Sequence, residues 1–379
     1  MAKNRKANVK SEAAKAKSKP KPKAKATVKA KPTVKATVKA TVKPTVKPTV
    51  KAEAKVKVAA VDPPRPPRPP ADKAPEHRSK PARKRTKVAF VGLGLMGAPM
   101  ASTILRAGFP LQVWNRTADK AKDLVTEGAT LAPTPAAAAR GADVVIVMVA
   151  DDAALDMVLF GEEGLSRGLK RGAVVVNCST TSPGMGFRAG TALRSLSVRF
   201  LEAPIMRSVY AAREGQLQML VGGTADDFAR ARSVLEVLAS DIHYVGDVGR
   251  AATLKLACNI LVAALTQAFA EYFVVARKSG VPFETMMSVL HAGPLDSQVL
   301  RDAEQTVVNP GARPNFYLRH MLKDLNLALE LAQQLDVPTP LAAATRQILA
   351  AANNLGHGNR DFGAIVELMA QWAAVPIRG

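Results

Sequence analysis

A glycine-rich run directly after a short apolar strand is the feature that most limits how this chain can fold. Residues 87–92 are predicted to form the strand, and the run begins at its last residue and opens a helix with apolar residues at helical spacing. The first glycine permits the tight turn, the second lets backbone approach a pyrophosphate, and the third lets the helix pack close to the strand. The pattern predicts a dinucleotide site, with a purely structural turn as the alternative. The residues expected to contact the cofactor here are Gly92, Leu93, Gly94, Leu95, Met96 and Gly97.

The rest of the chain continues the alternation of strands and helices up to about residue 248. Further short apolar strands are predicted at 111–114, 142–149, 174–177, 199–201 and 218–221. From residue 249 onward only helical patterns occur, at 251–278, 283–291, 296–308, 316–335, 339–355 and 361–373. The predicted fold class is therefore α/β: a Rossmann-type doubly wound parallel sheet followed by an all-α C-terminal domain.

The end of the second strand bears on the choice of cofactor. NAD sites place an acid about 20 residues after the glycines, to hold the ribose 2′-hydroxyl. Here the strand is followed by Asn115, Arg116 and Thr117, and no acid occurs from residue 109 to 118. A guanidinium would bind a 2′-phosphate through charge-assisted hydrogen bonds. We therefore expect these three residues to bind NADP, with NAD as the alternative cofactor; Arg116 could also be a solvated turn residue.

Charge divides the chain more sharply than its length. The chain carries a formal net charge of +23, and +22 of it lies in residues 1–86, which are rich in Lys and Pro and repeat the tripeptide Thr-Val-Lys. Such a segment has too few large apolar groups to offset its ordering entropy. The predicted organisation is a disordered basic tail at 1–86, an NADP-binding Rossmann domain at 87–248 and an all-helical domain at 249–379.

The tail would bind a polyanion such as DNA through counterion release. It has no aromatic residues, so base stacking and sequence reading are not expected. A solubilising tail without a dedicated partner is the alternative. We expect a cytoplasmic protein, associated with the nucleoid in a bacterium, or a nuclear one in a eukaryote.

Other classes of protein fit the sequence poorly. The chain has two cysteines, which cannot form a disulfide framework or a metal cluster, and both are expected to be buried. Five histidines show no ligand spacing, so no metal is expected. The most apolar stretch, 256–276, is interrupted by Asn259, Gln267 and Glu271, which favours a buried helix over a membrane span.

Several motifs, in order along residues 87–379, resemble the β-hydroxyacid dehydrogenases, the family of 3-hydroxyisobutyrate dehydrogenase and the glyoxylate and succinic semialdehyde reductases. The sequences that carry the resemblance are the glycine run extended through Ala98-Pro99-Met100-Ala101, Ser179-Thr180-Thr181-Ser182-Pro183, Glu202-Ala203-Pro204, Gly249 through Lys255 to Asn259, Lys323-Asp324-Leu325, and Gly356 to Asp361. A nuclear member of the same family also carries a chromatin-binding N-terminal extension.

The resemblance implies roles for individual residues. Lys255 matches the catalytic lysine and Asn259 its partner asparagine, while Thr180 and Lys323 match residues that contact the cofactor. The residues themselves agree on Lys255, since a lysine in an otherwise apolar helix is either held in a cleft or extends to solvent. Desolvation in a cleft would lower its pKa toward the range useful for proton transfer. Asn259 lies one turn later on the same face, and we expect it to orient the lysine or the substrate.

The predicted substrate loop departs from the family pattern. Ser179 and the segment after Pro204 are the expected substrate contacts, but Val-Ser-Gly-Gly is replaced by Ile205-Met206-Arg207-Ser208. Arg207 would take over the substrate carboxylate, or Met206 and Arg207 would narrow the pocket. The first of two family asparagines is replaced by Cys258.

Together these features predict an NADP-dependent oxidoreductase acting on a small β-hydroxyacid or the corresponding aldehyde or keto acid, with Lys255 as acid/base. The expected partners are a small carboxylate-bearing substrate, nucleic acid through the tail, and further copies of the chain in a homodimer or homotetramer; no membrane is expected. The alternative is a non-catalytic protein associated with DNA or chromatin, which uses the dehydrogenase body for binding or oligomerisation.

Overall fold

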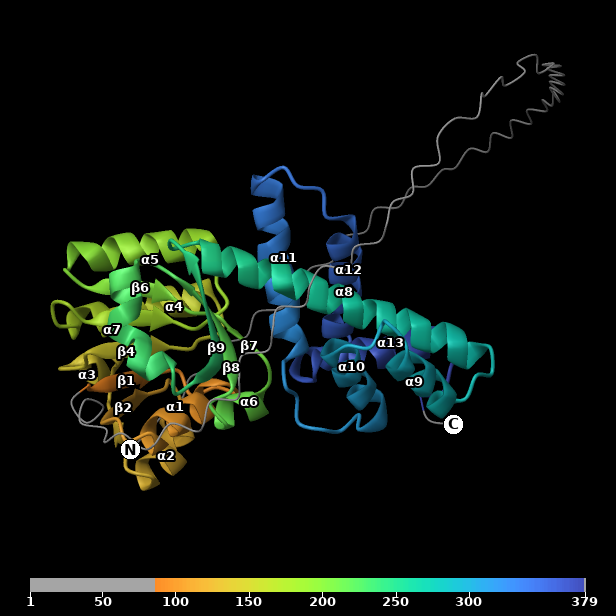
Figure 1. Ribbon diagram of the computed structural model, residues 1–379, viewed down its shortest axis with the longest axis horizontal. Coiled ribbons are helices and arrows are strands. Elements are labelled where there is room, and N and C mark those ends of the chain that lie inside the picture. Colours follow the sequence, from red (N-terminus) through yellow and green to blue (C-terminus); the bar gives the residue numbers. More distant parts are fainter. Residues whose placement is uncertain (1–85, 378–379) are drawn as a thin grey trace, which may run out of the picture. The chain divides into compact units, whose positions relative to one another are not determined.

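The computed structural model describes residues 86–377 of the chain. The predicted basic tail at 1–86, apart from Thr86, lies outside the described residues. The described part begins with a sheet and ends with a group of helices (Figure 1). The predicted Rossmann-type sheet followed by a helical domain is confirmed.

One nine-stranded sheet forms the first domain. Its strands are β1 (Val88–Val91), β2 (Leu111–Trp114), β3 (Thr130–Leu131), β4 (Val144–Val147), β5 (Val174–Asn177), β6 (Arg199–Glu202), β7 (Ile205–Met206), β8 (Leu217–Gly222) and β9 (Ala239–Gly246). The order is β3-β2-β1-β4-β5-β6-β8-β7, and β9 pairs with β8. The strands from β3 to β6 are parallel, whereas β6 and β7 pair antiparallel with β8. Strands β2 and β3 are added on one side of β1, and β4 is added on the other side. The strand order therefore changes direction between β1 and β4, and the carboxyl ends of these two parallel strands open onto one crevice.

The parallel strands are buried on both faces. Alternate residues of a strand point to opposite faces, and in β1 Phe90 belongs to one apolar core while Ala89 and Val91 belong to the other. The same division holds for Ile146 and Val147 in β4. Continuous apolar strands such as these are stable only when helices cover both faces.

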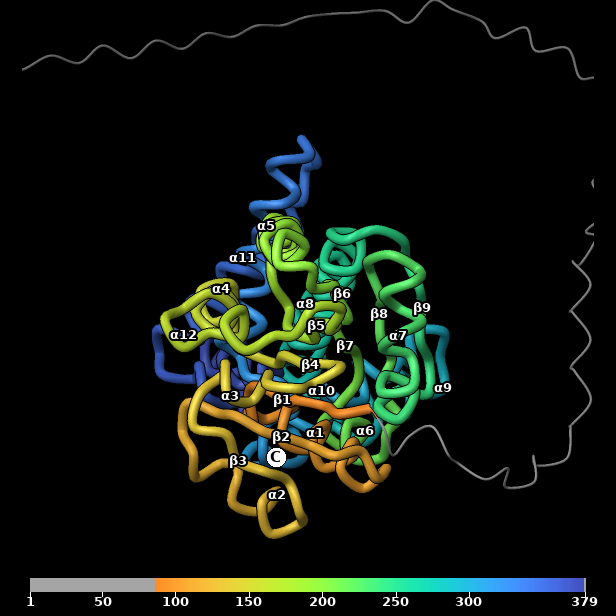
Figure 2. The backbone as a smooth tube through the Cα atoms, turned by 90° about the vertical axis from the view of Figure 1, so that its left-hand side faces the viewer, coloured from red at the N-terminus to blue at the C-terminus, as the bar shows by residue number. Residues whose placement is uncertain are grey.

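Helices supply that cover (Figure 2). Residues of α1 (Gly97–Arg106) and α7 (Ala225–Leu235) pack into one core, and those of α3 (Pro135–Ala139), α4 (Asp152–Phe160) and α5 (Pro183–Ser195) into the other. Two short helices complete the domain, α2 (Lys122–Thr126) and α6 (Val209–Arg213).

The second domain is built on one long helix, α8 (Arg250–Lys278), which runs from the sheet through the other helices (Figure 1). These are α9 (Phe283–Ala292), α10 (Gln298–Val308), α11 (Leu318–Gln334), α12 (Pro340–Asn354) and α13 (Ile365–Trp372). Among the described residues α8 is the one helix whose length and hydropathy would suit a membrane span. Half of its most apolar window is buried inside the protein, as in the core helix of a soluble domain.

The structure differs from the sequence-based expectations in several places. Three strands were not predicted: β3, β7 and β9. The first two have two residues each, and β9 lies at the edge of the sheet with a mixed, largely half-exposed pattern. Cys178 is buried as expected, but the expectation for Cys258 was wrong, because it is only half-buried. We keep the domain division at residue 249 as our own proposal, because it falls between β9 and α8.

Candidate functional site

The glycine run forms a tight turn between β1 and α1. Gly92 has φ +98°, and a Cβ at this residue would lie 2.1 Å from the carbonyl oxygen of Met148. A Cβ at Gly97 would lie 1.9 Å from the carbonyl oxygen of Gly92. Gly94, in contrast, faces open space with no atom within 4 Å. The outer two glycines therefore close the turn, and the middle one leaves backbone open to a ligand.

The N-cap residue of α1 gives the helix no side-chain cap. In the five helices α3 to α7, the N-cap side chain accepts a hydrogen bond from a first-turn amide. The N-cap of α1 is Met96, which has no such bond. The amide groups and the positive end of the helix dipole suit an anionic ligand at this position.

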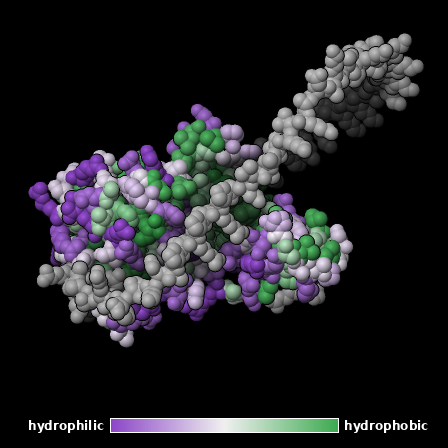
Figure 3. Space-filling view, in the orientation of Figure 1, coloured by the Kyte–Doolittle hydropathy of each residue, from purple (hydrophilic) through white to green (hydrophobic). Residues whose placement is uncertain are grey.

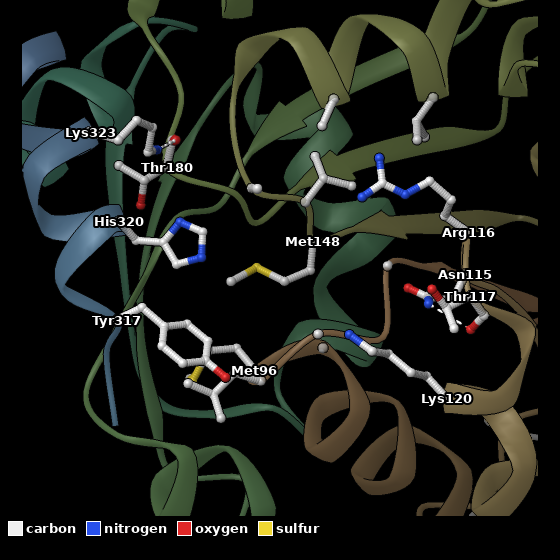
Figure 4. A pocket seen from close by; sticks show the side chains of 18 of the residues that line it. Met96, Asn115, Arg116, Thr117, Lys120, Met148, Thr180, Tyr317, His320 and Lys323 are labelled. Carbon is white, nitrogen blue, oxygen red and sulfur yellow. Dashed lines mark hydrogen bonds between the residues drawn. The ribbon is translucent and has the colours of Figure 1, made fainter. Parts of the chain in front are cut away.

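A cavity of about 500 Å³ opens over this turn (Figure 4). Its walls come from the glycine turn, the ends of β2 and β4, α4, and the start of α11. The predicted residues that line it are Gly92, Gly94, Leu95, Met96, Gly97, Asn115, Arg116, Thr117, Thr180 and Lys323. Leu93 does not line it, because its side chain is buried in the core.

Asn115 joins the end of β2 to the glycine turn. Its Oδ1 accepts a hydrogen bond from the amide of Leu93 at 2.9 Å, and its Nδ2 donates to the carbonyl of Thr117 at 2.8 Å. The amide side chain is therefore occupied within the protein. Asn115 positions the turn, and the neighbouring side chains remain available for a ligand.

Two cations reach into the cavity from the β2 side. Arg116 and Lys120 both line it and extend into it in Figure 4. Within residues 86–377, neither side chain has a hydrogen bond or an ion pair. The nearby acid Asp119 pairs with Lys122 at 3.1 Å on the surface. Lys120 was not predicted from the sequence, although it is a cation only four residues after Arg116.

The opposite wall comes from the start of α11. Tyr317, His320 and Lys323 are spaced by three residues and point into the cavity from one face (Figure 4). Burial, and then the positive charges of Arg319 and Lys323, lower the pKa of His320 to about 4. The imidazole is therefore neutral near pH 7. Tyr317 and His320 were not predicted from the sequence, although both fall on the face of the predicted helix that carries Lys323.

Lys323 crosses from α11 to the sheet domain. Its Nζ donates a hydrogen bond to the backbone carbonyl of Thr180, which follows β5. It also lies 2.7 Å from Oδ1 of Asp324, whose side chain is fully buried. Burial raises the pKa of Asp324, and the charge of Lys323 opposes that rise. The two cavity walls are thus joined by one lysine.

Lys255 lies buried next to this pair. Burial lowers the pKa of its ammonium group, and the charge of Asp324 partly opposes the decrease. Lys255 is 8 % exposed and does not line the cavity itself, whereas Asp324 does. The Nζ of Lys255 donates to Sδ of Met206 at 3.2 Å. A thioether is a weak acceptor, so an ammonium with three donors retains capacity for a ligand oxygen.

Asn259 has a different partner from the expected one. Its Nδ2 donates to Oδ2 of Asp324 at 2.6 Å, and among the described residues it makes no hydrogen bond to Lys255. Asn259 was expected to orient the lysine or the substrate. Its link to the lysine is indirect, and its contact with the substrate stays a prediction. Asn259 holds Asp324, and Asp324 acts on Lys255 through its charge.

The predicted substrate contacts after β6 are engaged within the protein. Arg207 has φ +78°, and its guanidinium donates to the carbonyl of Gln216, to Ser240 and to Asp241. The Oγ of Ser208 caps α6 by accepting from the amide of residue 211. The guanidinium of Arg207 therefore already has partners within the protein, and we do not assign the substrate carboxylate to it.

Ser179 is also engaged within the protein. Its Oγ accepts from the amide of Val149 at 2.9 Å, and the residue is 2 % exposed. Met206 is therefore the predicted substrate residue that reaches Lys255. Within the described part of the chain, no group of three His, Cys, Asp or Glu residues could hold a metal ion.

Comparisons with known proteins agree with this geometry. Residues 87–246 match the NAD binding domain of 6-phosphogluconate dehydrogenase, and residues 249–369 match the NAD-binding domain of NADP-dependent 3-hydroxyisobutyrate dehydrogenase. Glyoxylate/succinic semialdehyde reductase 1 of Arabidopsis thaliana is 32 % identical, over 74 % of this chain and 97 % of its own. The 3-sulfolactaldehyde reductase of Escherichia coli is 34 % identical, over 74 % and 94 %. The crystal structure of 3-hydroxyisobutyrate dehydrogenase from Salmonella typhimurium aligns with a TM-score of 0.70 and 28 % identity, covering 75 % of this chain and 99 % of the other.

The close contact at Gly92 gives a first prediction. In Gly92→Ala the new methyl group would meet the Met148 carbonyl, so the turn must open. We expect NADPH affinity to fall by more than about tenfold, a loss of about 1.4 kcal/mol. The measurement is a fluorescence titration with NADPH. Gly108→Ala is the matched control, since Gly108 also has a positive φ but nothing within 4 Å. Equal affinities in the two variants would contradict the assignment.

Proposed function

Because the chain belongs to the β-hydroxyacid dehydrogenase family, we propose that it is an NADP-preferring oxidoreductase with Lys255 as acid/base. Members of this family are NAD(P)-dependent dehydrogenases and reductases that act on CH–OH groups, and this protein is one of them. The proposed substrates are a small β-hydroxyacid and the corresponding aldehyde or keto acid. The observation that carries the proposal is the buried ammonium of Lys255, which has Asp324 beside it and, among residues 86–377, only a thioether as its hydrogen-bond partner.

The residues around the cavity fit a dinucleotide. The turn at Gly92, Gly94 and Gly97 and the uncapped start of α1 would hold the pyrophosphate. Arg116 and Lys120 would bind a 2′-phosphate, because both are cationic and unpaired and no acid faces them from the end of β2. When bound, the nicotinamide supplies the hydride.

The chain's own contribution to the chemistry is proton transfer. In reduction, the substrate carbonyl carbon gains a hydride and its oxygen becomes an alkoxide. Lys255, protonated, gives its proton to that oxygen, and in oxidation the neutral amine removes the hydroxyl proton. The lowered pKa of Lys255 serves both directions, because burial makes the neutral amine easier to form than in a solvated lysine. Asn259 holds Asp324 in place by a hydrogen bond, and the charge of Asp324 stabilises the protonated form of Lys255.

The contact between Met206 and Lys255 also bears on the alternative function. Met206 lies on Lys255, and the other polar groups of its segment are engaged elsewhere. These contacts favour a second candidate, a dehydrogenase-like body that binds the cofactor without turnover. Loss of catalysis would leave NADPH binding intact, so the two candidates are separated by assaying both properties in one preparation.

We also propose that the chain assembles with copies of itself, as a homodimer or homotetramer. Large apolar side chains are exposed where α11 ends and α12 begins, and Figure 3 shows them together at that tip. They are Leu335, Val337 and Leu341, each more than half exposed. Exposed apolar groups that gather in this way are typical of protein–protein contacts.

Cofactor preference provides the second prediction. We expect NADPH to bind at least about tenfold more tightly than NADH, the ratio given by one charge-assisted contact of about 1.4 kcal/mol. Arg116→Ala and Lys120→Ala should each weaken NADPH binding and leave NADH binding unchanged. Asp119→Ala is the control, since that side chain pairs with Lys122 on the surface. The same affinity for both cofactors in the wild type would remove the basis for the proposal.

The chemistry of Lys255 provides the third. Lys255→Ala should lose between about 10² and 10⁴ of kcat, the usual contribution of positioned acid/base catalysis, while its affinity for NADPH stays within about twofold. Lys255→Arg should fail nearly as severely, because a guanidinium does not exchange protons near neutral pH. The assay is NADPH oxidation with small aldehyde and keto acids. Near wild-type kcat in Lys255→Ala would show that another group moves the proton.

The tail provides the fourth. We propose that residues 1–86, with a net charge of +22, bind duplex DNA without sequence preference. The full chain should shift DNA in a gel, and its affinity should fall steeply as salt rises. A chain that starts at Lys87 has a net charge of +1 and should not bind. If the shortened chain binds as well as the full one, the body and not the tail is responsible. Nucleoid or nuclear localisation would follow from such binding, and a cytoplasmic protein is proposed otherwise.

A further inference from the structure

Glu202 is a buried carboxylate that the proposed chemistry does not use. It is the last residue of β6 and is 1 % exposed. Its Oε2 accepts hydrogen bonds from the amide of Gly249 at 2.7 Å and from that of Ala252 at 3.4 Å. These amides belong to the N-cap and first turn of α8, whose N-cap glycine has no side chain to cap the helix. Glu202 therefore caps α8 from a different part of the chain.

This single carboxylate joins the two segments that meet at the site. Met206 follows Glu202 by four residues, and Lys255 follows Gly249 by six. Their side chains are in contact, with Nζ of Lys255 3.2 Å from Sδ of Met206. A change in the distance between Glu202 and the start of α8 would therefore move Lys255 relative to Met206.

The surroundings are shaped for a carboxylate in this position. A Cβ at Gly186 of α5 would lie 1.9 Å from Oε1 of Glu202, so only glycine leaves room there. Gly249 has φ +93°, and a Cβ at this residue would lie 2.5 Å from the ring of Phe187. The chain turns into α8 through a conformation that suits glycine alone. Oε1 has no hydrogen-bond partner within the described residues.

We propose that Glu202 is a positioning residue: its ionised carboxylate holds the first turn of α8 against the end of β6 and so keeps Lys255 at the reacting oxygen. This inference rests on the proposed role of Lys255. It goes beyond that role, because Glu202 binds backbone amides three and six residues before the lysine and acts through the backbone of α8.

Keeping the carboxylate buried costs stability. Burial raises the pKa of Glu202 from 4.5 to about 7, and the two backbone hydrogen bonds oppose the rise. Because the folded pKa lies above the unfolded one, the folded state holds an extra proton between these values. Stability from this group is therefore full below about pH 4.5 and is lost as the pH rises to about 7. A carboxylate that destabilises the fold where it is ionised is typical of a functional group.

No charge around Glu202 contributes to this shift. The charged side chains on the elements packed against it include Arg188 on α5, which pairs with Asp156 at 2.9 Å. Asp247 and Arg250, at the start of α8, are exposed and lie 3.7 Å apart. Arg199, at the other end of β6, pairs with Asp226 and Asp227. The ammonium of Lys255 donates a hydrogen bond to Met206. Burial raises the pKa of Glu202, and the hydrogen bonds from two backbone amides oppose the rise. Because no other charged group is involved, Glu202→Gln mimics the protonated state.

The test compares Glu202→Gln with the wild type at pH 8 and pH 6. At pH 8 we expect kcat per NADPH-binding site to fall between about fivefold and a hundredfold, because small displacements of a catalytic group have effects of this size. NADPH affinity should stay within about twofold. At pH 6, where the wild-type carboxyl is mostly protonated, the two proteins should become alike. The control is Glu236→Gln, an exposed residue that pairs with Arg232.

Two further measurements do not depend on turnover. Amide hydrogen exchange of residues 247–256 should be faster in Glu202→Gln at pH 8 and equal to the wild type at pH 6. The variant should melt at the same temperature as the wild type or higher at pH 8, because the buried charge is gone. A lower melting temperature with unchanged kcat per site would show a purely structural role and overturn the proposal.

The outcomes also separate this inference from the proposed function. If Lys255→Ala is inactive but Glu202→Gln keeps the wild-type kcat and exchange rates at pH 8, only the role of Glu202 is wrong. If Lys255→Ala keeps its activity, the proposed chemistry fails, and the role of Glu202 falls with it even where hydrogen exchange shows that it caps α8.

Discussion

The carboxylate of Asp324 is the group on which the site depends. It is fully buried on α11, it receives a hydrogen bond from Asn259 of α8, and it lies 2.7 Å from Lys323. A buried carboxylate is stable only when donors and cations compensate for its lost hydration. Here the compensating groups are those that the proposed chemistry uses, because Lys323 bridges to the sheet domain at Thr180 and the charge of Asp324 acts on Lys255. One electrostatic requirement therefore fixes α8, α11 and the end of β5 relative to one another.

The cations at the predicted cofactor end of the cavity, unlike Asp324, have no compensating charge among the described residues. Elsewhere among the described residues, charged side chains form ion pairs, as Arg199 does with Asp226 and Asp227. Arg116 and Lys120 stand in the cavity without partners among the described residues. Unpaired cations at the mouth of a cavity attract an anion because no protein charge cancels their field. In the proposed function, exposed cations bind the cofactor and a buried one transfers the proton.

Much of the fold could be predicted from the sequence. The bounds predicted for the strands at 111–114 and 174–177 are those observed for β2 and β5. In β5 the reason is a continuous apolar run, which has few ways to be buried, whereas β2 alternates buried and half-buried residues. Strands β3 and β7 could not be found in this way, since two residues carry no period. Strand β9 lies at an edge, and its exposed residues, such as His243 and Tyr244, hide the alternation that marks a strand.

The sequence by itself determined the glycine turn and the order of strands and helices, and its resemblance to a known family singled out Lys255 as the residue to test. The turn and the order follow from local rules, in which backbone sterics, side-chain period and motif spacing act over a few residues. Only the tertiary structure decided which groups meet. Asn259 binds Asp324 across 65 positions, Lys323 reaches Thr180 across 143, and Glu202 caps a helix that begins 47 residues later. Such contacts depend on how the domains pack, and no local pattern specifies them, because the partner of a buried polar group is whichever donor or acceptor the fold brings within hydrogen-bond distance.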